Sequence, residues 1–166
     1  MRGQLNGPCR LRQADLGLGG MAEVTGPEGL TRPRAAMLLI VTSDGLLMHH
    51  RDDKPGIPHP GCWAGFGGAV EAGETVEEAL HREVAEETGL VILQPIFLTD
   101  AVDHEGDGRL VSLFYTVGDY RPGDIDLREG AGVAIHRMAD LPALKVTPFV
   151  RRAIESHLLP LVADGM

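Results

Sequence analysis

The amino-acid sequence predicts an α/β protein in which a mixed β-sheet is flanked by helices. Its 166 residues are enough for about one domain that buries most of its apolar surface without disulfide or zinc staples. Short apolar segments separated by turn residues favour strands, and they stand on both sides of one strongly capped central helix. A second amphipathic segment lies near the end of the chain, and no internal repeat marks a second domain.

The first 30 residues differ in composition from the rest of the chain. They are Gly-rich, and residues 1–20 carry arginines without an apolar core, so they make a poor secretory signal. We therefore expect residues 1–30 to form an N-terminal extension that contributes little to the core. Residues 31–166 are expected to form a single domain.

The segment 35–52 predicts two strands joined by a hairpin turn. Its apolar runs flank Ser43-Asp44-Gly45, and an Asp-Gly pair between apolar runs is a strong hairpin signal. The next segment, 54–61, contains three prolines and two glycines, which exclude regular secondary structure. We predict a loop there that leads into Trp63.

Residues 75–88 are the clearest helix in the sequence. Thr75 suits the N-cap position, and Glu78 three residues later completes a capping box. Gly89 stands where helices commonly end in a left-handed residue. Apolar residues recur at helical spacing along this segment, so we expect one face to pack against the sheet: Val76, Ala79, Leu80 and Val84.

Strands are expected again over residues 91–102 and 109–117, with a polar turn between them. The stretch Asp103–Gly108 resembles the start of a calcium-binding loop, but Phe114 stands where the chelating Glu should be, so we expect a hairpin turn. A short strand over residues 132–136 follows, and the apolar spacing of residues 148–161 indicates a terminal helix.

Charge and composition limit the partners of this protein. With 24 acidic and 15 basic residues the formal net charge is −9, whereas duplex nucleic acid is bound by basic faces that release counterions. We therefore expect no duplex nucleic-acid partner. No apolar run approaches the length of a membrane span, so no membrane partner is expected either. Cys9 and Cys62 lie in no CxxC spacing, which favours a reducing compartment, and we expect a cytoplasmic protein.

The central helix carries an acidic cluster. At about 100° per residue, Glu83, Glu86 and Glu87 fall on the same face as the apolar residues, so we expect them to turn toward the protein. Like charges at this spacing repel, and burial adds to the cost unless a cation compensates. Such clusters suit Mg²⁺, although a solvated acidic face is the alternative interpretation. The glycine-rich turn 67–74 permits close backbone approach and favours the metal interpretation.

The turn and the helix together carry residues at fixed spacing. With five, seven, one and one residues between them, these are Gly68, Glu74, Arg82-Glu83-Val84, Glu86-Glu87 and Gly89-Leu90. At every fixed position this pattern resembles the Nudix box, the signature of the Nudix hydrolase family, which includes MutT-like proteins. The resemblance implies an α/β/α sandwich over roughly residues 34–161, in agreement with the mixed sheet expected above.

The resemblance also implies a metal site. Glu83 and Glu87 would be the principal ligands, and Glu86 would share the metal or act on water. A backbone carbonyl of the glycine turn, that of Gly68, would be a further ligand. The implied cofactor is Mg²⁺, with Mn²⁺ as an alternative.

Other residues would orient the site or move a proton. Arg82 matches the residue that orients the glutamates through salt bridges, with Glu74 as its partner. Glu129, in Leu127-Arg-Glu-Gly130, matches the later acidic residue that serves similar proteins as a ligand or general base. The sequence leaves three candidates for the catalytic base: Glu83, Glu86 and Glu129.

Residues near the loop 54–61 are candidates for substrate contacts. Arg51 and Lys54 could meet a substrate phosphate, with solvated charge as the alternative. Phe66 replaces the Pro that similar proteins often carry before the two glycines, and we expect it in the wall of the pocket. The histidines of this region are expected to be ordinary surface residues rather than metal ligands: His49, His50 and His59.

The acidic cluster and the resemblance both indicate hydrolysis of a pyrophosphate link. A cation beside such a densely negative group lowers the repulsion felt by an incoming water. The expected substrate is a nucleoside diphosphate joined to another moiety: a nucleoside triphosphate, a dinucleoside polyphosphate or a nucleotide sugar. A nucleotide-sensing or binding module of the same fold, without turnover, is the alternative. Dimers are common among similar proteins, so a homodimer is also expected.

Overall fold

Strand β1 (Arg34–Thr42) is the central strand of the computed structural model, which describes residues 34–163. Every residue after Arg34 in this strand is buried, as is typical of a strand covered on both faces. Its side chains alternate between two hydrophobic clusters. Met37 packs toward the C-terminal helices, and Leu38 packs toward α1 (Val76–Thr88).

Six strands form one mixed sheet. Strand β2 (Gly45–His50) is antiparallel to β1 and also pairs with β3 (Trp63–Ala64) and β6 (Gly132–His136). On the other side of β1, β5 (Leu110–Val117) runs parallel to it, and β4 (Ile96–Val102) is antiparallel to β5 at the edge. The predicted mixed sheet is confirmed.

The segment after β3 lies along β1 and thereby positions the glycine turn. Leu38 N donates to Phe66 O at 2.7 Å, and Phe66 N returns a bond to Leu38 O at 3.0 Å. Two residues further on, Ala36 N donates to Gly68 O at 2.9 Å. After β3 leaves the side of β2, the chain therefore crosses to lie beside β1. Gly67 and Gly68 lie against the first half of this central strand.

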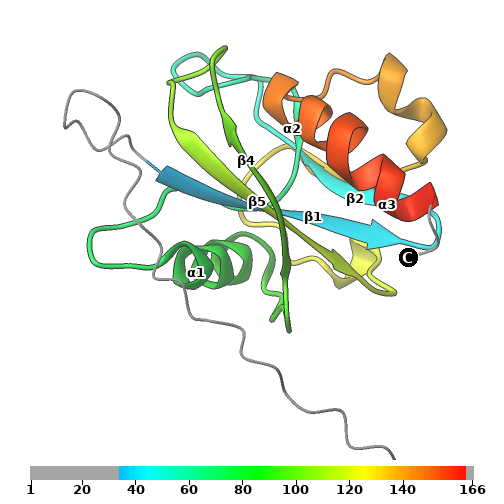
Figure 1. Cartoon of the computed structure of the whole chain (residues 1–166), viewed down its shortest axis with the longest axis horizontal. Helices are drawn as coiled ribbons and strands as arrows, with labels where there is room; N and C mark the ends of the chain where they lie inside the picture. Colours follow the sequence, from blue (N-terminus) through cyan, green and yellow to red (C-terminus); the bar gives the residue numbers. More distant parts are fainter. Residues whose placement is uncertain (1–33, 164–166) are drawn as a thin grey trace, which may run out of the picture. The chain divides into compact units, whose positions relative to one another are not determined.

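Helix α1 covers one face of the sheet and has the limits that the sequence predicts (Figure 1). The Thr75 hydroxyl accepts from Glu78 N at 3.2 Å, and the Glu78 carboxylate accepts from Thr75 N at 2.8 Å, which completes the capping box. Gly89 ends the helix with φ of +71°. The predicted apolar face is buried against the sheet, together with Phe66 and Phe114.

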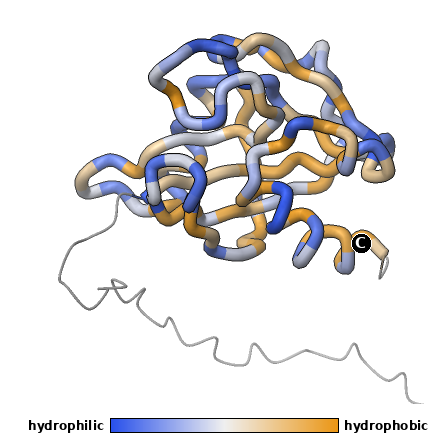
Figure 2. Tube along the Cα trace, turned by 90° about the horizontal axis from the view of Figure 1, so that it is seen from above, coloured by the Kyte–Doolittle hydropathy of each residue, from blue (hydrophilic) through white to orange (hydrophobic). Residues whose placement is uncertain are grey.

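The C-terminal part of the chain covers the other face (Figure 1). Helix α2 (Pro148–Ala153) continues through a π-helical turn, η3 (Ile154–Leu158), into α3 (Leu159–Ala163). Two 3₁₀ helices flank β6: η1 (Pro122–Asp124) and η2 (Met138–Ala143). Figure 2 shows apolar residues concentrated in the strands and polar residues in the outer loops. The predicted terminal helix is confirmed and extends slightly beyond residue 161.

One predicted boundary is wrong. The strand expected over residues 91–102 begins at Ile96, and Val91 is 80% exposed. The physical reason is local, because Pro95 has no N–H to donate to β5 and Gln94 has a φ of +55°, so the extended backbone begins only at Ile96 although β5 continues to Val117. Apolar residues before Ile96 therefore do not pair with β5.

The N-terminal extension predicted for residues 1–30 lies outside the described residues, as do the outermost residues of the predicted domain 31–166. Among the helices between residues 34 and 163, none has the length and apolar character needed to cross a membrane.

Candidate active site

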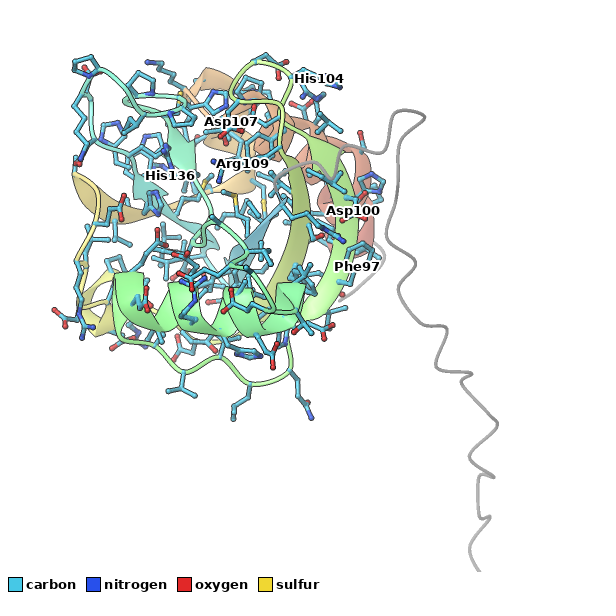
Figure 3. The ribbon with its side chains drawn as sticks, turned by 90° about the vertical axis from the view of Figure 1, so that its left-hand side faces the viewer. Phe97, Asp100, His104, Asp107, Arg109 and His136 are labelled. Carbon is cyan, nitrogen blue, oxygen red and sulfur yellow. The ribbon has the colours of Figure 1, made fainter. Side chains whose placement is uncertain are left out.

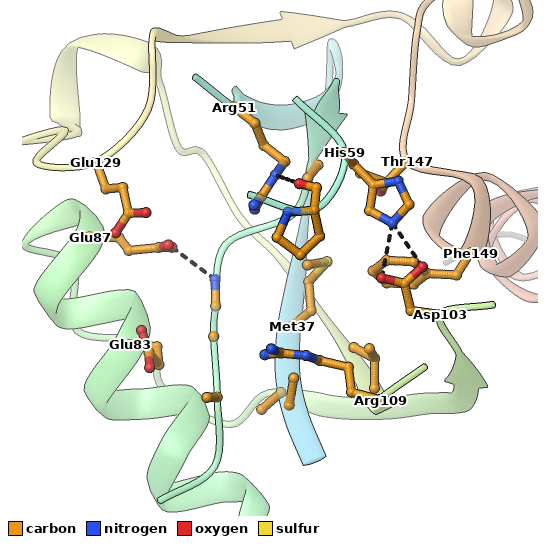
Figure 4. Close-up of a pocket in the computed structure, with 18 residues that line it drawn as sticks. Met37, Arg51, His59, Glu83, Glu87, Asp103, Arg109, Glu129, Thr147 and Phe149 are labelled. Atoms are coloured by element: carbon orange, nitrogen blue, oxygen red, sulfur yellow. Dashed lines mark hydrogen bonds and ion pairs between the residues drawn. The ribbon is translucent and has the colours of Figure 1, made fainter. Parts of the chain in front are cut away.

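Two carboxylates of α1 face a cavity of about 270 Å³ (Figure 4). Glu83 and Glu87 lie one helical turn apart, so both side chains reach the same side of the helix. Glu87 is only 8% exposed although it is acidic. Burial of a carboxylate requires a compensating partner, which the glycine turn supplies in part.

The glycine turn contacts both carboxylates directly. Gly67 N donates to Glu87 Oε2 at 2.8 Å. A Cβ at Gly68 would lie 2.5 Å from Glu83 Cδ, so any other residue here would displace this carboxylate from its position beside the backbone. The Gly68 carbonyl accepts from Ala36 N at 2.9 Å and keeps a second lone pair for another ligand.

Glu129 joins these carboxylates from a distant part of the chain. Its segment is fastened to α1 because Arg128 N donates to Glu87 O at 2.9 Å, and to β2 because Ala131 N donates to His50 O at 2.7 Å. Figure 4 shows the Glu129 carboxylate beside that of Glu87. The name "carboxylate wall" is used below for this group: Glu83, Glu87, Glu129 and the turn Gly67–Gly68.

Arg82 orients the carboxylate wall from the outer side. Its Nε and Nη2 donate to the two oxygens of Glu74 at 2.8 and 2.9 Å, and its Nη1 donates to Glu83 Oε1 at 2.9 Å. The predicted pair with Glu74 is therefore present. Hydrogen bonds from Arg82 lower the pKa of Glu74. The carboxylates of Glu74 and Glu83 in turn raise the pKa of Arg82. One oxygen of Glu83 is held in place, and the other is left for a ligand.

The carboxylate wall carries negative charge that the protein does not balance. Burial raises the pKa of Glu87 to about 8, and the nearby charges of Glu129 and Glu83 add to this effect. The hydrogen bond from Gly67 N and the charge of Arg51 oppose it only partly. A cation is the group that would stabilise this arrangement.

Two arginines face the carboxylate wall across the cavity (Figure 4). Arg51 Nε donates to Pro58 O at 3.0 Å, which leaves its terminal nitrogens for other partners. Arg109 Nε donates to both oxygens of Asp107, at 2.9 and 2.7 Å. Figure 3 shows Arg109 and Asp107 together near the turn between β4 and β5. Both guanidinium groups are thus held by neighbours while they line the cavity.

A buried His–Asp pair lies further along the same cavity. His59 Nε2 is 2.8 Å from Asp103 Oδ1 and 2.9 Å from Oδ2, and the two side chains are 9% and 4% exposed. Phe149 packs beside the imidazole, with 6.0 Å between ring centroids. The Thr147 hydroxyl is buried and has no hydrogen-bond partner within residues 34–163. This second group is named the far wall: His59, Asp103, Arg109, Thr147 and Phe149.

Four predicted site residues do not line the cavity, and one of them is Arg82, which holds Glu83 from outside it. The Glu86 side chain is 63% exposed and lies 3.5 Å from Arg82, so the expected orientation toward the protein is wrong, and its role on the metal stays a prediction. Lys54 pairs with Asp52 at 2.8 Å on the surface of the loop. Phe66 is fully buried and packs edge-on against His49, so it has a core role in place of the expected place in the pocket wall.

Sequence reasoning also missed residues that do line the cavity. His59 was expected at the surface, but its side chain is only 9% exposed, lines the cavity and faces Asp103. His49 was also expected at the surface, but it is buried and does not line the cavity. Arg109 could have been noticed because Asp107 stands two residues before it in a turn. No pattern in the sequence indicated that His59 would lie next to Asp103, because 44 residues separate them along the chain.

A family model described as the NUDIX domain matches residues 31–156 of this chain. The protein belongs to the Nudix family. An ADP-ribose pyrophosphatase of Methanocaldococcus jannaschii is 38% identical over 73 residues, which are 40% of this chain and 43% of that protein. The nucleoside triphosphatase NudI of Escherichia coli O139:H28 is 45% identical over 64 residues, 37% of this chain and 44% of that protein. The matches therefore span less than half the length of these Nudix relatives.

Solved structures share the fold. The MutT protein of Methanosarcina mazei Go1 superimposes with a TM-score of 0.60 at 24% identity and covers 76% of this chain and 94% of its own. The MutT NUDIX hydrolase of Burkholderia pseudomallei gives a TM-score of 0.62 at 23% identity, and the superposition covers 74% of this chain and 95% of that one. The α/β/α arrangement expected from the Nudix box is thereby confirmed.

The carboxylate wall fits the divalent cation that Nudix hydrolases generally use. Among residues 34–163 no three acidic, His or Cys side chains already converge on one point, and Arg82 and Gly67 N each occupy one oxygen, of Glu83 and of Glu87 respectively. The available donors are nevertheless all oxygens, the ligands that Mg²⁺ prefers. Burial, and to a smaller extent the charges of Glu129 and Glu83, raises the pKa of Glu87, and a bound cation would oppose that shift.

Proposed function

We propose that this protein is a divalent-cation-dependent pyrophosphohydrolase that acts on a nucleoside diphosphate joined to another moiety. The observation that carries the proposal is a single cavity with uncompensated carboxylates on one side and two arginines on the other. An arrangement of this kind suits a cation and a polyanion together. The names of the relatives, an ADP-ribose pyrophosphatase and a nucleoside triphosphatase, agree with a nucleotide substrate.

The cation would be held by Glu83, Glu87 and the Gly68 carbonyl, with Mg²⁺ as the expected ion and Mn²⁺ as an alternative. When bound, it would offset the charge of the pyrophosphate oxygens and of the leaving phosphate. Arg82 keeps the Glu83 carboxylate in one orientation, and Gly67 N does the same for Glu87. This preorganisation reduces the cost of bringing like charges together around the ion.

Arg51 and Arg109 would bind the phosphates that face away from the cation. Guanidinium groups form short charge-assisted hydrogen bonds to phosphate oxygens. Because Pro58 O and Asp107 already hold these side chains in place, little rotamer entropy is lost when the substrate binds. The two arginines would therefore place the scissile link next to the carboxylate wall.

Glu129 is our choice as the general base among the three candidates. Its carboxylate lines the cavity and accepts no hydrogen bond from residues 34–163. Glu83 is bonded to Arg82, and Glu86 lies outside the cavity. A carboxylate with free lone pairs beside other negative charges is suited to take a proton from water.

The test is release of phosphate or nucleoside monophosphate from a panel of ADP-ribose, nucleoside triphosphates and dinucleoside polyphosphates, with and without Mg²⁺. Turnover that depends on Mg²⁺ supports the proposal. Glu129→Gln should lower kcat by roughly a hundredfold or more with little change in KM. Absence of turnover on the whole panel, together with measurable nucleotide binding, would instead favour the binding module.

The expected homodimer is tested by light scattering on the purified chain. The expected cytoplasmic location stays a prediction.

A further inference from the structure

We infer that the His59–Asp103 pair selects the part of the substrate that lies beyond the phosphates. The Asp103 carboxylate would accept hydrogen bonds from two neighbouring donor groups of that part. The inference rests on the proposed function and names the recognition step within that same cavity. It concerns the end of the cavity at Asp103, which Figure 4 places beyond Arg109 as seen from the carboxylate wall. Phosphates held near Arg109 would leave the rest of the substrate directed toward this end.

The pair is rigid and presents mainly acceptors. A carboxylate can only accept, so His59 Nε2 carries the proton that is shared between the two oxygens of Asp103. His59 itself is held in a left-handed conformation with φ of +54°. Gly106 packs so closely that a Cβ there would collide with Asp103 Oδ2. The remaining lone pairs of Asp103 thus keep a fixed direction.

The surroundings of the pair suit an organic group rather than water. Met37, Val111 and Phe149 line the cavity beside it. The buried Thr147 hydroxyl has no hydrogen-bond partner within residues 34–163, so this end of the cavity contains a polar group that a ligand could satisfy. An apolar cavity with a few fixed polar groups is the usual form of a specificity pocket.

A purely structural role for Asp103 is the competing explanation. The pair does join the loop 54–61 to the turn between β4 and β5. That turn, however, has other anchors, because Arg152 donates to both oxygens of Glu105 at 2.6 and 3.1 Å, and Gly108 N donates to Asp103 O at 2.9 Å. The turn is held without the Asp103 carboxylate, which leaves that group available for recognition.

Two parts of a nucleotide offer adjacent donors to a carboxylate. One is a base edge with a ring N–H next to an exocyclic amino group, and the other is the pair of ribose hydroxyls. Removing only the amino group, as in ITP against GTP, probes the first source. Removing only the 2′-hydroxyl, as in dGTP against GTP, probes the second.

The experiment measures kcat/KM for GTP, ITP and dGTP with Mg²⁺ in the wild type and in Asp103→Asn. We expect the wild type to prefer GTP over one of the two analogues by roughly tenfold or more, because a buried charged acceptor loses a donor. Asp103→Asn should bring that ratio close to one. Ratios between substrates do not depend on the folded fraction of a preparation, so a structural defect would not move them.

Glu105→Gln is the matched control, since it removes the same charge from the same turn but pairs with Arg152 outside the cavity. It should leave both ratios unchanged. If Asp103→Asn does not fold, His59→Asn carries the test, because Asn tolerates the left-handed conformation, and the same ratio should fall roughly threefold.

Each outcome decides the inference. A change in the GTP:ITP ratio supports it with the base as the source of donors, and a change in GTP:dGTP supports it with the sugar. If the wild type cleaves GTP, ITP and dGTP equally well, this inference is overturned while the proposed function stands. The same holds if the wild type prefers GTP and Asp103→Asn keeps that preference. A wild type that cleaves no nucleotide with Mg²⁺ would overturn the proposed function and this inference with it.

Discussion

The two walls of the cavity balance their charges in different ways. On the far wall each charged side chain already has a partner, since Asp103 pairs with His59 and Arg109 with Asp107. On the carboxylate wall Glu87 lies beside Glu129 and Glu83, and burial together with these charges raises its pKa to about 8.

The difference separates recognition from chemistry. Paired charges keep a fixed geometry at little cost, which suits contacts that must discriminate between ligands. Like charges held together cost free energy until a cation or a proton compensates them, which suits a metal site. The carboxylate wall is therefore incomplete in the protein alone, whereas the far wall is already organised.

The largest expected effect comes from the carboxylate wall. Glu83→Gln and Glu87→Gln should each lower kcat/KM with Mg²⁺ by roughly a thousandfold, because each removes a charge that the cation needs. Thermal melting should change little, since Gln keeps the shape of the side chain. Glu77→Gln, on the exposed side of the same helix, is the control and should stay active. Wild-type turnover in Glu83→Gln would contradict the assignment of this wall.

A backbone substitution tests the same wall without removing a charge. In Gly68→Ala the new Cβ would lie 2.5 Å from Glu83 Cδ, so the flexible carboxylate must move while the fold adapts. We expect kcat/KM to fall by roughly a hundredfold, because small displacements of reacting groups are costly. Gly132→Ala is the control, since nothing lies within 4 Å of its Cβ position. Equal activity of the two variants would show that Glu83 needs no fixed position.

A smaller effect is expected on the far wall. Arg109→Gln should raise KM by roughly tenfold and leave kcat within a few-fold, because it removes a phosphate contact and no reacting group. Arg121→Gln is a matched control, since Arg121 also pairs with an Asp two residues earlier, at 3.3 Å, but is exposed. A drop in kcat at unchanged KM would place Arg109 with the chemistry and erase the distinction between the walls.

The smallest effect concerns the support beneath the carboxylate wall. His49 is buried next to Gly130, the neighbour of Glu129. Burial lowers the pKa of His49 from 6.5 to about 4. The charges of Arg51 and His50 also lower it to a smaller extent, whereas the charge of Asp52 raises it. The unfolded chain therefore takes up a proton near pH 6.5 that the folded protein refuses until about pH 4, so this contribution to stability is lost as the pH falls.

The measurement compares urea unfolding of the wild type and His49→Leu between pH 7 and 4.5. The stability of the variant relative to the wild type should rise by about 1 kcal/mol for each pH unit below 6.5. Using this difference removes the pH dependence of other groups such as Glu87. His81→Gln, at an exposed position on α1, is the control. A difference that does not vary with pH would show that His49 is protonated as readily in the folded protein.

Much of the fold could be predicted because its signals are local. The capping box at Thr75, the helix end at Gly89 and the strand 132–136 all stand where the spacing of residues places them. The start of β4 was predicted too early, although Pro95, which cannot donate to a neighbouring strand, stands directly before it. The exposure of Glu86 was also missed, because its position on the helical wheel did not reveal that it reaches back toward Arg82.

By itself the sequence determined Glu83 and Glu87 on α1 and the glycine turn before them, because they lie within one continuous segment and the two carboxylates are one helical turn apart. The family resemblance named Glu129 as a candidate for the site, but only the tertiary structure brought it next to Glu87 and brought His59 next to Asp103. The reason is that hydrogen bonds between segments far apart in the chain create these neighbours, and spacing along the sequence carries no record of them.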